Sequence, residues 1–62
     1  MNEAFVIALG SNQYVRFRDG EPERCTLQEA DQFDTKTEAI LQCMDYGINL
    51  YTLEAVESTE RA

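Results

Sequence analysis

The sequence contains no histidine and no tryptophan, and it has only two cysteines, one proline and five basic residues among its 62 positions. Without histidine, Cys25 and Cys43 cannot complete a zinc site, and their spacing is not that of metal ligands. The chain also lacks a glycine-rich phosphate loop and a nucleophile motif. Catalysis further requires a cleft that shelters convergent groups with tuned pKa values, which so small a domain does not offer. The sequence therefore predicts a protein that is not an enzyme, with no cofactor and no metal.

Long hydrophobic runs are missing as well. The longest, residues 4–9, is far shorter than the roughly 20 apolar residues that span a bilayer. Glu3 is the only charge before it, so the run has no basic flank of the kind that precedes a secretory signal. We expect a cytoplasmic protein. In such a compartment Cys25 and Cys43 should be free thiols, although a disulfide between them stays open at this point.

The composition is that of a small folded domain, because 44% of the residues are hydrophobic. A chain of this length buries only about 60% of the surface that its unfolded form exposes, so the core must be thin. We expect a single domain over residues 1–62, with a frayed tail at 58–62.

The first half of the chain reads as strands joined by turns. Residues 4–9 form a continuous apolar run, typical of a central strand. A turn at 10–12 leads into residues 13–18, where Val15 and Phe17 alternate with Tyr14, Arg16 and Arg18 and so predict a half-buried strand. Pro22 is expected to stop the ladder within a second turn at 19–22. An edge strand over 23–27 and an irregular or single-turn segment over 28–33 should follow.

A helix is predicted in the second half. Thr35 and Glu38 have the spacing of a capping box, and Gly47 is a natural residue to end the helix. Between them, residues 36–46 place one apolar stripe on the buried face: Ala39, Ile40, Cys43, Met44 and Tyr46. Residues 48–56 are rich in β-formers again. The order ββ(β)αβ predicts an α+β fold, a small antiparallel sheet of three to four strands with one helix packed on a face.

Negative charge is concentrated in the middle of the chain. The net charge is −7, and residues 19–45 alone carry eight acids against Arg24 and Lys36. Binding to nucleic acid requires clustered basic residues, so nucleic acid is excluded as a direct ligand, and an anionic membrane surface is disfavoured for the same reason. A basic protein surface is the favoured partner. The acids could also serve only to keep a small protein soluble.

Carboxylates at alternate positions of an extended segment lie on one side, about 6.6 Å apart. A row of this kind could imitate the phosphates of nucleic acid and occupy a groove built for them. The candidate partner-binding residues are the eight acids of the central segment: Asp19, Glu21, Glu23, Glu29, Asp31, Asp34, Glu38 and Asp45.

A family resemblance points the same way. The stretches Tyr-Val-Arg-Phe-Arg-Asp-Gly at 14–20 and Leu-Gln-Glu-Ala-Asp-Gln-Phe-Asp-Thr at 27–35, running into Glu38 and Ala39, resemble small phage and prophage proteins built as a hairpin followed by a capped helix. With its size and acidity, the chain is similar to anti-CRISPR proteins, particularly inhibitors of type I, multi-subunit effectors. The resemblance implies binding to a Cas effector subunit in the bacterial cytoplasm and a block of target DNA recognition. It assigns no residue roles.

The alternative is a phage or bacterial structural or adaptor module, which could be a homodimer that uses an exposed β edge or an aromatic patch. Tyr14, Tyr46 and Tyr51 could anchor such an interface, although each could equally be an ordinary residue at the rim of the core. An acidic mimic should be a monomer whose binding weakens with salt, whereas the interface of an adaptor should be hydrophobic and insensitive to salt.

Overall fold

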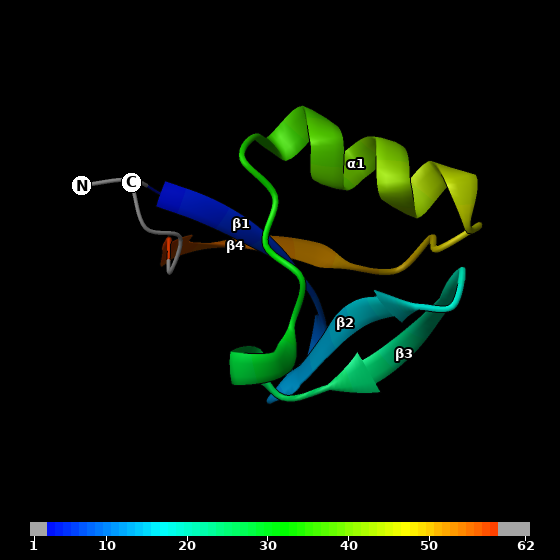
Figure 1. Cartoon of the computed structure of the whole chain (residues 1–62), viewed down its shortest axis with the longest axis horizontal. Helices are drawn as coiled ribbons and strands as arrows, with labels where there is room; N and C mark the ends of the chain where they lie inside the picture. Colours follow the sequence, from blue (N-terminus) through cyan, green and yellow to red (C-terminus); the bar gives the residue numbers. More distant parts are fainter. Residues whose placement is uncertain (1–2, 59–62) are drawn as a thin grey trace.

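The computed structural model describes residues 3–58, which form an α+β fold as the sequence predicted. One antiparallel sheet has the strand order β3-β2-β1-β4, so β1 is central, and a helix packs across it (Figure 1). Of the predicted tail, residues 59–62 lie outside the described residues. The elements are β1 (Glu3–Gly10), β2 (Gln13–Arg18), β3 (Glu21–Cys25), the 3-10 helix η1 (Leu27–Glu29), α1 (Lys36–Asp45) and β4 (Thr52–Glu57).

Two tight turns build the three-stranded meander. Asp19 and Gly20, which join β2 to β3, both have positive φ (54° and 77°), the arrangement that suits the twist of a two-residue hairpin. The prediction that Pro22 stops the ladder is wrong. The β2–β3 ladder begins at Glu21 and pairs Pro22 with Phe17. The N–H of Phe17 bonds away from β3, so this pair needs no donor from proline.

The central strands β1 and β2 separate soon after their turn. They pair at Ala8 with Tyr14 and at Gly10 with Gln13, with an irregularity between the two pairs. From Ala8 back to Glu3, β1 still pairs with β4 on one side but no longer pairs with β2 on the other. The sheet therefore has a split between its two middle strands, and backbone groups on both sides of the split need partners.

The segment that follows η1 fills this split. Phe33 exchanges two backbone hydrogen bonds with Phe5 of β1, at 2.8 and 2.9 Å. Toward β2, the Asp31 N–H donates to the Val15 carbonyl at 3.3 Å, and the Asp31 carboxylate accepts from the Phe17 N–H at 2.9 Å. Residues 31–33 thus act as a short connecting strand between β1 and β2.

The sheet is covered on both faces. On one face Ile7 and Val15 pack against Ala39 and Cys43 of α1. The other face has its own small cluster, in which Ala30, just after η1, covers three residues of the sheet: Val6, Ala8 and Tyr14. Figure 1 shows α1 above the sheet and η1 below it. The expectation that the side of β2 bearing Tyr14 faces solvent is therefore wrong at Tyr14, which is buried because η1 covers it.

Both ends of α1 are closed as predicted. The Thr35 hydroxyl accepts from the Glu38 N–H at 3.1 Å, and the Glu38 carboxylate accepts from the Asp34 N–H at 3.2 Å. At the other end Gly47 has φ 71°, which lets the Ile48 N–H reach the Cys43 carbonyl at 2.9 Å in a Schellman closure. This closure leads the chain into a loop, so β4 starts at Thr52 and not near residue 48.

The buried face of α1 is narrower than the sequence predicted. Ala39 and Cys43 are fully buried, whereas Ile40 is 39% exposed and Met44 69%. The prediction that Ile40, Met44 and Tyr46 share the buried stripe is wrong for all three. Two small residues one turn apart let the helix lie close to the sheet, and a close approach leaves the larger flanking side chains outside the contact.

Substitution at Ala39 tests this orientation. Ala39→Asp should lower the free energy of unfolding by about 3 kcal/mol or more, because it places a charge in the helix–sheet contact. Leu41→Asp, at a position that is 53% exposed, should cost less than about 1 kcal/mol. Urea denaturation measures both, and Ile40→Asp should fall between them. Equal losses for the two variants would show that α1 packs by a different face.

The bridging role of Asp31 is tested by removing its acceptor. Asp31→Ala leaves the part-buried Phe17 N–H without its partner and should cost about 1–3 kcal/mol of unfolding free energy. Asp31→Asn retains a carbonyl acceptor and should lose less unfolding free energy. Asp45→Ala, which removes the same charge from the end of α1, should be neutral or slightly stabilising. If Asp45→Ala loses as much stability as Asp31→Ala, the loss comes from the removed charge and not from the hydrogen bond to Phe17.

Candidate protein-binding surfaces

The eight predicted acids occupy four different environments, and Asp31 differs from the rest. Its side chain is half-buried and accepts the Phe17 N–H, so it holds the sheet together. The other seven are exposed. The eight do not form a single row: they come from the β2–β3 turn, β3, η1, the segment between η1 and α1, and the two ends of α1. Reasoning from sequence spacing alone missed the structural use of Asp31, because its partner lies 14 residues away.

Arg16 gathers two of the acids on the η1 side of the sheet. Its Nε lies 3.2 Å from the Glu23 carboxylate, and its Nη1 lies 4.0 Å from that of Glu29. β3 pairs Glu23 directly opposite Arg16 and Glu21 opposite Arg18. Exposed ion pairs of this kind contribute at most about 1 kcal/mol each. Each pair offsets negative charge locally, so the surface of the β2–β3 hairpin is less negative than its acidic residues alone would make it.

The acids at the start of α1 serve the helix. The Glu38 carboxylate accepts the Asp34 N–H, and negative charge near a helix N-terminus is favourable. Lys36 lies beside them in sequence, with its ammonium 5.8 Å from the centre of the Phe5 ring. Asp34 and Glu38 are exposed, but Glu38 already has a structural partner.

Four of the candidate side chains have no hydrogen bond or ion pair within the described residues 3–58. One is Asp34, before the start of α1; the other three are Asp19, Glu21 and Asp45. Asp19 and Glu21 lie at the β2–β3 turn, and Asp45 is the last residue of α1. Figure 1 shows the β2–β3 turn and the end of α1 on the same side of the molecule. A ring contact between Phe17 and Tyr46, with centroids 4.9 Å apart, joins the two regions. The fold thus collects these three free carboxylates at one end.

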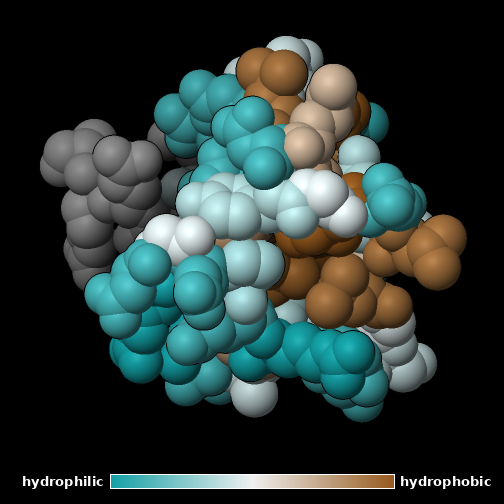
Figure 2. Space-filling view, turned by 90° about the vertical axis from the view of Figure 1, so that its right-hand side faces the viewer, coloured by the Kyte–Doolittle hydropathy of each residue, from teal (hydrophilic) through white to brown (hydrophobic). Residues whose placement is uncertain are grey.

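The same end carries apolar surface, which we call the end surface: the exposed Met44 and Leu50 and the half-buried Leu9 and Ile48. Leu50 is 87% exposed, more than any other large hydrophobic residue described. Two shallow hollows of about 220 and 250 Å³ meet at Leu9, one lined by Ile48 and the other by Leu50. Figure 2, which views the molecule from this end, shows apolar surface beside a hydrophilic margin. An apolar centre beside charged groups is the usual anatomy of a protein–protein interface.

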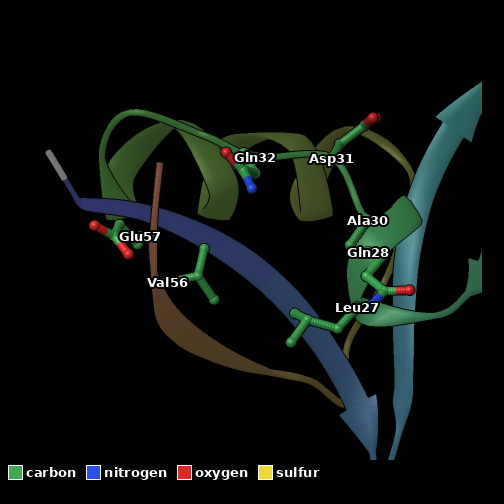
Figure 3. A pocket seen from close by; sticks show the side chains of 7 residues that line it. All are labelled: Leu27, Gln28, Ala30, Asp31, Gln32, Val56 and Glu57. Carbon is green, nitrogen blue, oxygen red and sulfur yellow. The ribbon is translucent and has the colours of Figure 1, made fainter. Parts of the chain in front are cut away.

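A third hollow lies on the η1 side of the sheet, along β4. It has a volume of about 450 Å³, and Leu27 and Val56 face each other across it (Figure 3). The chain that leaves η1 forms one wall and the end of β4 forms the other. Its remaining lining residues are Gln28, Ala30, Asp31, Gln32 and Glu57. We call this hollow the β4 groove.

The three tyrosines differ in their availability to a partner. Tyr14 is buried, and its hydroxyl donates to the Glu54 carboxylate at 3.0 Å. That hydrogen bond, burial and the charge of Glu54, in this order, raise the pKa of Tyr14 above its ordinary value of about 10. Tyr51 is half-buried, and Tyr46, which is 37% exposed, packs on Phe17. Of the three tyrosines proposed as anchors, Tyr46 is the most open to a partner.

Both cysteines are free thiols. Cys25 packs in the cluster under η1 and Cys43 in the cluster under α1, so the sheet separates them. Burial raises the pKa of both thiols, which disfavours the reactive thiolate. Within residues 3–58, no group of three or more acidic, cysteine or histidine side chains is placed to hold a metal ion, and no helix is long and apolar enough to cross a membrane.

Comparisons of the chain with protein-family models, with curated proteins and with solved structures give no match. The charges, surfaces and edges of the fold itself are therefore what indicates a function.

The Tyr14–Glu54 contact makes an alkaline prediction. Because the folded state favours the neutral phenol, this stabilisation is complete below the ordinary pKa near 10 and is lost as the pH rises through the raised folded value. Glu54→Gln should bring the Tyr14 titration back toward its ordinary pKa, measured by the ultraviolet absorbance of tyrosinate. Tyr14→Phe identifies which part of the signal belongs to Tyr14. An unchanged midpoint in Glu54→Gln would show that Glu54 does not act on Tyr14.

Proposed function

We propose that this chain is an inhibitor without catalytic activity that binds a basic protein surface through its carboxylates, in the cytoplasm of a bacterial cell. The resemblance to anti-CRISPR proteins makes a Cas effector subunit the partner, and a block of target DNA recognition the result. One observation supports this proposal most: the side chains of Asp19, Glu21 and Asp45 are exposed, lie on elements that meet at one end of the described structure, and take no part in its side-chain hydrogen bonds or ion pairs.

Exposed carboxylates without partners cost the fold little free energy and remain available to a partner. They stay solvated in the free protein, and a basic partner can pair with them without breaking contacts inside the fold. A net charge of −7 on 62 residues also accelerates encounter with a basic surface. The core is apolar and, among the described residues, includes no buried charged side chain. Recognition and folding therefore use largely different residues.

Mimicry of phosphates has support in part of the acidic set. Glu21 and Glu23 are two positions apart in β3, so their carboxylates leave the same face about 6.6 Å apart, close to the spacing of phosphates along a strand of nucleic acid. Asp19 continues this line at the turn. Glu29 ends η1, so Glu29 and Asp31 do not extend the row as an alternating strand would. We propose Asp19, Glu21 and Glu23 as the row, with Asp45 nearby.

Reversing charge at the turn tests the proposal. Asp19→Lys with Glu21→Lys should abolish inhibition of DNA binding by purified type I effector complexes. The fold should lose about 1–2 kcal/mol of stability, because lysine is less favourable than aspartate at the positive φ of residue 19 and, at position 21, lies opposite Arg18. Inhibition by the unchanged protein should also weaken as salt rises, since exposed charges are screened.

Glu3→Lys with Glu60→Lys is the matched control. It makes the same change in net charge at two positions outside the proposed row and should inhibit nearly as well as the unchanged protein. If the turn double variant inhibits DNA binding as strongly as the control, the acids serve solubility. If the unchanged protein affects no type I effector, the proposed target is wrong.

A second candidate function is the adaptor module, and the end surface favours it. Leu50 at 87% and Met44 at 69% exposure are unusual for hydrophobic residues on so small a protein. A partner that covers them would bind through apolar contact, and salt would change that binding little. The salt titration described above separates the two candidates, since only charge-based recognition should weaken steeply.

A further inference from the structure

The two edges of the sheet are not equivalent. Phe5 of β1 directs both its N–H and its carbonyl toward Phe33, away from β4. In an antiparallel ladder the neighbouring residues alternate, so Ala4, Val6 and Ala8 are the ones that bond to β4. Their partners are Val56, Glu54 and Thr52. The backbone groups of the intervening residues of β4, Leu53, Ala55 and Glu57, therefore point outward. Within residues 3–58, β4 has a neighbour on one side only.

The β3 edge is protected by contrast. Val15 and Phe17 bond toward Asp31, so Pro22 and Arg24, which lie opposite them, direct their backbones to the outer edge. Proline has no N–H to offer there, and charged side chains flank it. A further strand would find only one donor on β3. It would find three donors and three acceptors on β4.

We propose that β4 is a docking edge, and that its occupant is an extended segment of a basic protein which adds to the sheet as a fifth strand. This inference rests on the proposed function and names how the basic partner is held. Backbone hydrogen bonds to Leu53, Ala55 and Glu57 supply the attachment, and side chains supply the selection.

Charge selects the occupant. β4 alternates, so Glu54 lies on the η1 side of the sheet. Glu57, opposite Glu3 of β1, is directed toward the α1 side by the same alternation, although it also borders the end of the β4 groove. An added strand thus meets a carboxylate on each of its two faces, and lysine or arginine opposite them forms favourable cross-strand pairs. The β4 groove lies beside Val56, with Leu27 on its far wall, and can receive the aliphatic stem of a long basic side chain that reaches over the strand.

The same charges disfavour a second copy of this chain. Two β4 strands that meet about a two-fold axis at Ala55 would place Glu54 diagonally across from the Glu54 of the other copy. Each copy also carries a net charge of −7. Like charges so close destabilise a strand pair, so a basic segment fits this edge better.

Amide hydrogen exchange followed by NMR tests the edge directly. The probe is a short capped peptide in which lysine alternates with threonine, and its match carries glutamate in place of lysine. The lysine peptide should slow exchange of the Leu53, Ala55 and Glu57 amides by about tenfold or more. The Thr52, Glu54 and Val56 amides, already bonded to β1, are the internal reference. The glutamate peptide should protect none of the three outward amides.

Two variants, each with a matched control, separate backbone pairing from simple charge attraction. Ala55→Pro removes the central outward donor without removing a bond to β1, and it should abolish the protection. Ala55→Thr keeps the donor and should retain it. Glu57→Lys leaves every backbone group in place and should weaken binding of the lysine peptide by about fivefold. Asp45→Lys, the same charge change at the end of α1, should weaken it less. If Ala55→Pro does not fold, the comparison of Glu57→Lys with Asp45→Lys tests whether the lysine peptide binds at the β4 edge.

Several results would overturn the inference. Protection by the glutamate peptide equal to that by the lysine peptide would remove charge selection. Protection that grows with the concentration of the free protein would make a second copy the occupant. Loss of effector inhibition in Asp19→Lys with Glu21→Lys, together with full inhibition by Ala55→Pro, would reject the docking edge while the proposed function stands.

Discussion

The structure depends on the way residues 31–33 fill the split between β1 and β2. Phe33 pairs with Phe5 on one side, and Asp31 satisfies the Val15 carbonyl and the Phe17 N–H on the other. Without this segment, backbone groups of both central strands would lie unpaired next to the core, at a cost of about 1–3 kcal/mol for each buried group. The same segment connects η1, on one face of the sheet, to α1 on the other (Figure 1). It therefore determines where both covering elements lie.

This arrangement explains why the acids of one short segment differ in what they do. Asp31 is used inside the sheet, Glu38 caps α1, and Glu23 and Glu29 share Arg16. Asp19, Glu21 and Asp45 remain exposed at one end, where apolar side chains such as Leu50 also gather. A domain with so thin a core uses some of its polar groups to complete its hydrogen bonds and displays the rest. The displayed groups, and the open edge of β4, are what a partner can bind.

Much of the fold could be predicted from local sequence signals. The residues from Gln13 to Arg18 form the strand that their alternation indicated, and Thr35, Glu38 and Gly47 begin and end the helix as their capping chemistry requires. The buried stripe of α1 and the burial of Tyr14 could not be predicted in this way. Each depends on how closely another element approaches: the sheet in the case of Ile40, and η1 in the case of Tyr14.

The sequence by itself determined the fold class, the order of the elements, the ends of the helix and the strongly negative charge. These follow from interactions over a few residues, namely hydrophobic periodicity, caps and turn conformations, and from composition. The tertiary structure alone decided which acids are free, and that the sheet splits between β1 and β2 where residues 31–33 pair with both strands. It also decided that, within residues 3–58, the β4 edge offers more outward backbone donors than the β3 edge. Those properties depend on hydrogen bonds between residues far apart in the chain, such as Phe5 with Phe33 and Phe17 with Asp31, and no local pattern encodes the register of such contacts.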